Sequence, residues 1–140
     1  MSPVVERLAE LRRHLDHLRE LQPRVTGAAA LRQDLSLHND VLYSLLTVCQ
    51  VVIDVAGELS ARRGLRFEDY TEAVRNLASF PEIPPELVAA LEPLPDFRNV
   101  LIHEYVTLDL ERVIEALGRL DAIDGFGEAV RQIEASAQIQ

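Results

Sequence analysis

The chain has 140 residues, 48% of them hydrophobic and 26% charged, which excludes a disordered protein and predicts a single domain over residues 1–140. Its 14 basic residues are all arginine and face 23 acidic ones, and the net charge of −9 argues against a general nucleic-acid coating protein. The longest uncharged stretch, residues 41–53, is shorter than the roughly 18 residues that a membrane span needs, so no transmembrane helix is expected.

Hydrophobic residues at intervals of three and four predict an amphipathic helix at the start of the chain. Ser2 and Pro3 suit its N-terminus, because serine caps unpaired amides and proline lacks the amide that a first turn leaves without a partner. Pro23 and Gly27 are expected to follow its end. The apolar positions of this helix are Val4, Leu8, Leu11, Leu15 and Leu18.

A second, longer helix is predicted from about residue 28 or 36 to Arg62. Its middle, residues 41–59, is apolar on nearly every face, so we expect this helix to be central and the most deeply buried. Gly64 follows, and a glycine at this point favours the left-handed backbone conformation that ends many helices.

The next segments are punctuated by prolines. A short helix is predicted over 68–78, followed by a proline-rich loop. Another helix is predicted to begin at Pro84, and Pro93 and Pro95 are expected to kink or restart it, because proline removes an amide donor and clashes with the preceding turn.

A last helix is predicted from Asp109 towards Ile133, weakened at Gly125 and Gly127. No segment shows the sustained alternation of a strand. The sequence therefore predicts an all-α fold, an up-and-down bundle of four to five helices.

Two polar side chains interrupt the apolar stripe of the helix that begins at Pro84. Continuing the spacing of its leucines leads to Arg98, Leu101 and Tyr105, where a helix seam normally carries aliphatic residues. This pattern indicates either a polar groove or a partner that covers the site. Asn99 and His103 lie four residues apart, on one face of the same helix.

A second polar pair, Gln50 and Asp54, lies in the apolar central helix. Because a buried carboxylate is costly without a partner, one hypothesis is that Asp54 faces Arg98 or His103 across the bundle and orients it. The alternative is that Asp54 reaches solvent at the edge of the helix.

Residues Arg98 to Tyr105, RNVLIHEY, match the R-x4-H-x-Y motif, and the chain resembles the HepT-like branch of the HEPN superfamily over roughly residues 35–126. The arginine and histidine spacing alone would arise about 0.4 times by chance in this composition, and the added tyrosine lowers that to the order of 0.01. The resemblance implies an HEPN-like fold and an RNA endonuclease that needs neither a metal nor a cofactor. It also implies that Arg98 stabilises the negative charge of the phosphate and that His103 transfers protons. Asn99 would orient the histidine or a phosphate oxygen.

The same resemblance implies two protein partners. A homodimer would bring two motifs together and supply the two proton-handling groups that acid–base cleavage requires. HepT-like toxins are typically paired with an MntA-like minimal nucleotidyltransferase antitoxin, which transfers AMP to the motif tyrosine, here Tyr105. The added anion would repel RNA and silence the toxin.

Several other readings of the sequence stay open. The intact motif could belong to a non-catalytic HEPN-type module that binds a nucleotide or a nucleotidyltransferase partner, or to a helical dimerisation protein. His14 and His17 lack further ligands at metal-binding spacing, so no metal site is predicted, and both are expected on a solvated face. The single cysteine, Cys49, and the absence of an apolar signal segment at the N-terminus predict a cytoplasmic protein.

Overall fold

The computed structural model describes residues 3–104 and 106–139, and all regular structure within those ranges is helical. This confirms the all-α prediction. The α-helices are α1 (Pro3–Leu21), α2 (Ala28–Gln33), α3 (Leu35–Arg62), α4 (Tyr70–Arg75), α5 (Pro85–Leu91), α6 (Leu94–His103), α7 (Leu110–Leu117) and α8 (Leu120–Ile139), with 3-10 turns at η1 (Gln22–Arg24) and η2 (Asn76–Ser79).

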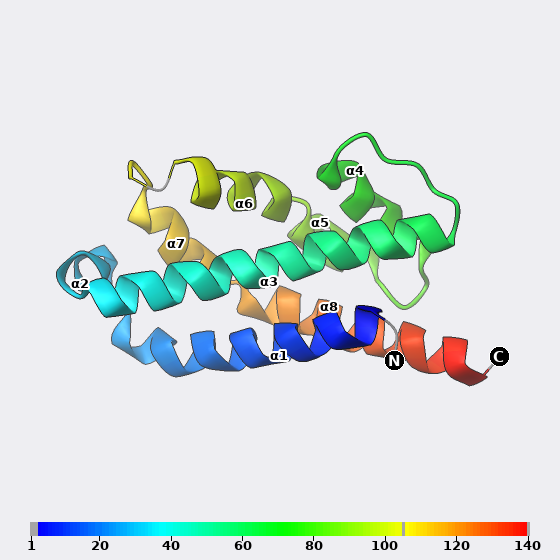
Figure 1. Cartoon of the computed structure of the whole chain (residues 1–140), viewed down its shortest axis with the longest axis horizontal. Helices are drawn as coiled ribbons and strands as arrows, with labels where there is room; N and C mark the ends of the chain where they lie inside the picture. The colour runs from blue at the N-terminus through cyan, green and yellow to red at the C-terminus, as the bar shows by residue number, and fades with distance from the viewer. Residues whose placement is uncertain (1–2, 105, 140) are drawn as a thin grey trace.

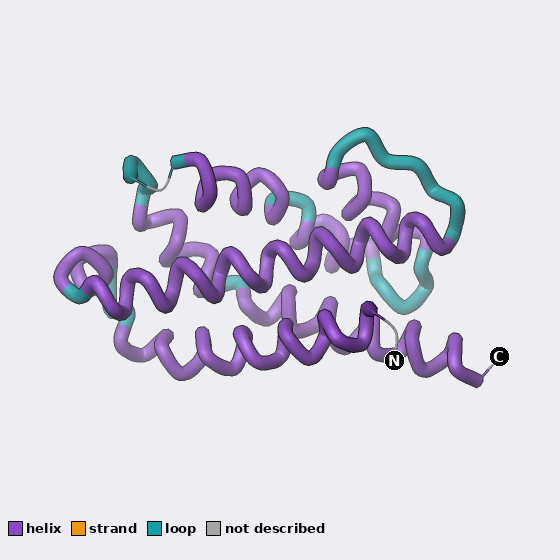
Figure 2. Tube along the Cα trace, viewed as in Figure 1, coloured by secondary structure: helices purple, strands orange, loops and turns teal. Residues whose placement is uncertain are grey.

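The chain passes up and down four times along the long axis of the molecule (Figure 1). The first pass is α1, the second is α3, the third is α5 followed by α6, and the fourth is α7 followed by α8. Most loops lie at the two ends of the bundle, as Figure 2 shows. The predicted bundle is therefore confirmed, with two of its four passes broken into shorter helices.

Helix α3 is the core of the molecule, as its composition predicts. It packs against both α1 and α6, and its apolar residues from Val48 to Ala56 are almost completely buried. By length and composition alone α3 could cross a membrane, yet 61% of its most apolar window is buried inside the bundle. The leucine stripe of α1 is buried against it, since Leu11, Leu15 and Leu18 are at most 2% exposed.

Local capping decides where α3 begins and ends. Asp34 has extended backbone angles, and its carboxylate accepts a hydrogen bond from the Leu37 amide at 3.1 Å, so α2 and α3 are two helices. The alternative start at about residue 28 is wrong for this reason. At the other end Gly64 has a φ of +65° and the Leu65 amide reaches back to the Ser60 carbonyl, which confirms the predicted glycine cap.

The last pass differs from its prediction. The chain breaks at Gly118, so the expected single helix is divided into α7 and α8. Gly125 and Gly127, by contrast, lie inside an unbroken α8, so they do not interrupt the helix. A Cβ atom at Gly127 would lie 3.2 Å from Leu11 Cδ2, so the glycine permits α8 to pack closely on α1.

Candidate functional site

Helix α6 presents the motif residues on two of its faces. Phe97 and Leu101 are buried and hold the helix against the core, whereas Asn99 and His103 are exposed. Arg98 lies between these faces and is half-buried. The helix restarts at Leu94, after Pro93, and this restart sets the direction of the motif side chains. Tyr105 lies outside the described residues.

Arg98 is held in an unusual way. Its guanidinium carbon lies 5.4 Å from the centroid of the Tyr70 ring, at the start of α4. Its Nε is buried and has no hydrogen-bond partner, and Arg98 forms no ion pair within the part of the chain that the structure describes. Since the two terminal nitrogens are not buried in this way, they can present an end-on fork to a ligand at the surface.

The positive charge of Arg98 also affects the buried thiol of Cys49. Burial raises the pKa of the Cys49 thiol to about 12, and the positive charge of Arg98 opposes this shift without cancelling it. Cys49 is 1% exposed, so the thiol is neutral at physiological pH and shielded from solvent. A nucleophilic role for this cysteine is therefore excluded on physical grounds.

Asp54 does not face the motif, and the hypothesis that it pairs with Arg98 or His103 is wrong. Its carboxylate accepts a hydrogen bond from Arg7 Nη1 at 2.7 Å and another from Gln50 Nε2 at 2.9 Å. Arg7 belongs to α1, so Gln50 and Asp54 join α1 to α3. The reason is geometric, because these positions lie on the face of α3 that is turned away from Cys49 and α6.

The histidines of α1 also differ from their prediction. The His14 side chain is 12% exposed, and its ring bridges Ser44 Oγ and Glu10 Oε1 at 2.9 Å each, so the expected solvated position is wrong for this residue. His17 is more exposed, at 41%. Within residues 3–104 and 106–139 no three His, Cys, Asp or Glu side chains lie close enough to hold a metal ion.

An apolar surface surrounds the exposed end of α6. Ile102 is 43% exposed and Val106 is 95% exposed. The start of α3 lies near the same end of the molecule as the end of α6 (Figure 1). On α3, Leu35 and Tyr43 are 71% and 64% exposed. A shallow groove of about 230 Å³ lies there, lined by Asn39, Leu42, Tyr43, Leu46 and Leu101. Exposed apolar side chains gathered around a polar motif are typical of an interface.

Tyr70 is the residue of this site that sequence reasoning missed. It precedes Arg98 by 28 positions and lies on a different helix, so no local spacing connects the two. The sequence marks the start of α4 through Asp69, whose carboxylate caps the Glu72 amide at 2.8 Å. Only the packing of α4 on α6 shows that the ring at this helix start lies against the guanidinium.

Comparisons with known proteins agree with this architecture. A family model described as ribonuclease HepT-like matches residues 11–133. The tRNA nuclease HepT of Aphanizomenon flos-aquae is 27% identical over 139 residues, covering 96% of this chain and 91% of the relative. The mRNA nuclease HepT of Shewanella oneidensis is 21% identical over 115 residues, covering 81% and 84%.

A solved structure gives the same result for the fold. The tri-AMPylated Shewanella oneidensis HEPN toxin, in complex with an MNT antitoxin, superposes with a TM-score of 0.79 at 20% identity. The superposition covers 94% of this chain and 99% of that chain. The HEPN-like helical fold is therefore confirmed.

Proposed function

The chain belongs to the ribonuclease HepT-like family, and on that premise we propose that it is a metal-independent RNA endonuclease and the toxin of a toxin–antitoxin pair. One observation carries this proposal: α6 presents Arg98 and His103 at the surface, and Arg98 forms no ion pair in the described part of a chain with 23 acidic residues. An arginine kept apart from carboxylates retains its charge for a phosphate.

The proposed reaction needs a base, an acid and a cation. The RNA 2′-hydroxyl attacks the adjacent phosphorus and loses its proton to a base, while the bond to the 5′-oxygen breaks and an acid protonates that oxygen. A 2′,3′-cyclic phosphate and a 5′-hydroxyl result. Histidine suits both proton transfers near neutral pH, and the fork of Arg98 stabilises the negative charge that develops on the phosphoryl oxygens. Asn99, one turn before His103, orients the imidazole or a phosphate oxygen.

A homodimer supplies the second proton-transfer group, because each chain carries one His103. The exposed apolar side chains of Leu35, Tyr43, Ile102 and Val106 support a second copy as the partner that covers this end of the molecule. Size-exclusion chromatography with light scattering should give a mass of about twice 15.7 kDa for the wild type. Leu35→Asp should shift the protein to monomer, because it places a charge in the apolar interface.

We further propose that a nucleotidyltransferase partner silences the toxin by transferring AMP to Tyr105. The tyrosine oxygen would attack the α-phosphorus of a nucleoside triphosphate, releasing pyrophosphate and a proton. The resulting phosphodiester would carry a negative charge two residues along the chain from His103, and this charge would repel the RNA backbone. Intact mass after co-expression with such a partner should show AMP additions that Tyr105→Phe lacks. We expect the protein to act in the cytoplasm, where its proposed RNA substrate is present.

The decisive experiment is ribonuclease activity of the purified, unmodified protein in EDTA. We expect cleavage to survive chelation and to fall at least 100-fold in His103→Ala and in Arg98→Ala. His17→Ala and Arg131→Ala are matched controls on the exposed faces of α1 and α8, and they should retain activity. If wild type and all four variants are equally inactive and no adduct is present on Tyr105, the catalytic proposal fails and a non-catalytic binding module takes its place.

A further inference from the structure

Two arginines border the exposed face of α6. Successive residues of an α-helix are about 100° apart, so Arg98 lies about 100° round α6 from the buried Phe97, and His103 lies about 240° round it. The guanidinium carbon of Arg112, on α7, lies 5.8 Å from the centroid of the Phe97 ring. The exposed arc of α6 that carries His103 therefore runs from Arg98 at one edge to Arg112 at the other.

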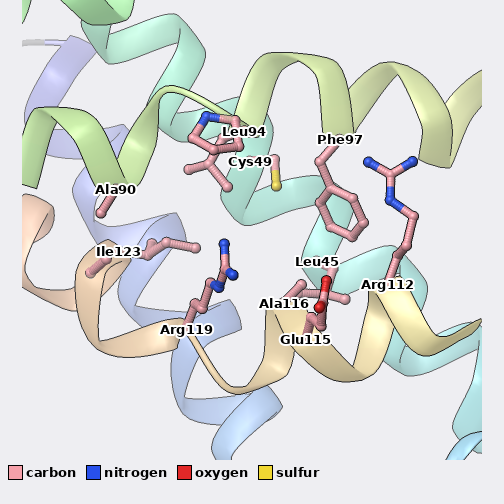
Figure 3. A pocket seen from close by; sticks show the side chains of 12 residues that line it. Leu45, Cys49, Ala90, Leu94, Phe97, Arg112, Glu115, Ala116, Arg119 and Ile123 are labelled. Carbon is pink, nitrogen blue, oxygen red and sulfur yellow. The ribbon is translucent and has the colours of Figure 1, made fainter.

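Arg112 is held in the same way as Arg98. Both guanidinium groups lie over an aromatic ring, and neither forms an ion pair with any other residue in the described ranges 3–104 and 106–139. Arg112 is exposed, and Figure 3 shows its guanidinium raised from α7 towards α6, whereas the Glu115 carboxylate lies on the α7 side of the Phe97 ring. The charge of Arg112 is therefore available to an anion that lies on α6.

The separation of the two arginines suits a strand with several phosphates. An α-helix with its side chains is about 10–12 Å across, so groups at its two edges do not bind one and the same phosphate. Successive phosphates of a stacked strand rise by about 3.4 Å. A strand that crosses α6 with one phosphate at Arg98 would therefore bring another, within about three nucleotides, to Arg112.

We propose that Arg112 is a second phosphate-binding residue and that the RNA substrate lies across the exposed face of α6, from Arg98 to Arg112. This inference rests on the proposed ribonuclease function and adds to it the path of the substrate. A strand held on both sides of His103 has less freedom to move relative to the imidazole. Because Arg112 contacts a phosphate that does not react, it contributes to substrate binding, whereas Arg98 acts on the transition state.

A non-cleavable RNA analogue tests this binding directly. An oligouridylate of about 12 nucleotides with 2′-O-methyl groups lacks the attacking hydroxyl, and fluorescence anisotropy can follow its binding to the purified, unmodified full chain. Arg112→Gln should raise the dissociation constant about tenfold, through the loss of one charge-assisted contact. It should also reduce the slope of log K against log [salt] by about 0.7, the value for one phosphate of a single strand. Arg112→Lys keeps the charge and should keep the slope.

Arg63→Gln is the matched control. The Arg63 guanidinium also lies over a ring, 3.9 Å from the centroid of Phe80, but at the end of α3 that is far from α7 (Figure 1). This variant removes the same charge and should leave both the dissociation constant and the salt slope unchanged. In cleavage assays in EDTA, Arg112→Gln should raise KM about tenfold and change kcat less than about twofold.

The outcomes separate this inference from the proposed function. An unchanged dissociation constant and slope in Arg112→Gln, or equal weakening in Arg63→Gln, would overturn the inference even if the wild type cleaves RNA. Absence of wild-type binding at about 100 μM protein would also overturn it. Binding that depends on Arg112, in a wild type that leaves RNA uncut in EDTA, would support the inference and contradict the proposed nuclease activity alone.

Discussion

The arginines of α1 and those of α6 and α7 are held by opposite means. Arg7 and Arg19 donate hydrogen bonds to Asp54 and Asp121 at 2.7 and 3.0 Å. Arg98 and Arg112 instead lie over the rings of Tyr70 and Phe97, and neither pairs with a carboxylate in the described part of the chain.

The difference concerns charge more than stability. An exposed ion pair and an exposed cation–π contact each contribute roughly 0.5–1 kcal/mol to folding. A carboxylate balances the positive charge of the arginine beside it. An aromatic ring also positions the guanidinium group but leaves its charge available for an anionic ligand. In a chain with an excess of acidic residues, arginines whose guanidinium groups lie over aromatic rings therefore identify surfaces that are suited to bind anions.

The largest expected effect is on activity. Arg98→Met should lower kcat/KM about 10²- to 10³-fold, because it removes the cation that stabilises the transition state. The free energy of unfolding in urea should stay equal or rise, since the substitution also removes a buried Nε–H that lacks an acceptor. Arg7→Met is the matched control, with unchanged activity and lower stability. A large loss of stability in Arg98→Met would contradict the comparison.

Breaking a paired arginine should act on folding instead. Arg62 pairs with Glu134, whose side chain is only 9% exposed. Arg62→Met should lower the free energy of unfolding by about 2 kcal/mol, because it removes a cation that pairs with a nearly buried carboxylate. Adding Glu134→Gln should restore part of the loss, and no recovery in the double variant would show that packing dominates.

The pH dependence of stability reports the effect of the Arg98 charge on the pKa of the buried Cys49 thiol. The Cys49 thiol pKa rises from 9.0 to about 12 on folding, so stability is fully present below pH 9 and is lost as the pH rises towards 12. Between pH 7 and 10 the wild type should lose about 1.4 kcal/mol more than Cys49→Ala in urea titrations. Arg98→Met should raise the thiol pKa further, because the positive charge that lowers it is removed.

Replacing Tyr70, whose ring lies against Arg98, should lower activity by a smaller factor. Tyr70→Leu removes the cation–π contact and should lower kcat/KM about fivefold, which corresponds to about 1 kcal/mol, whereas Tyr70→Phe should retain activity. The loss should fall mainly on kcat if Tyr70 positions the guanidinium. Equal losses in both variants would instead indicate a role for the hydroxyl group.

The smallest expected effect belongs to the pair that joins α1 to α3. Arg7 and Asp54 have side chains that are 46% and 27% exposed, so a double-mutant cycle should give a coupling energy of about 0.5 kcal/mol or less. The coupling should fall further in 1 M NaCl. A coupling above about 2 kcal/mol would show that paired arginines contribute far more to this fold than the comparison implies.

The sequence by itself determined the all-α class, the central position of α3, the glycine cap at Gly64 and the motif that carries the family resemblance. These features depend on local periodicity and on residues close together in the chain, which a linear pattern records. It could not determine that Asp54 points to α1, that α7 and α8 are separate, or that Tyr70 supports Arg98. Each of these depends on the angle at which one helix meets another, and side-chain packing between distant segments sets that angle.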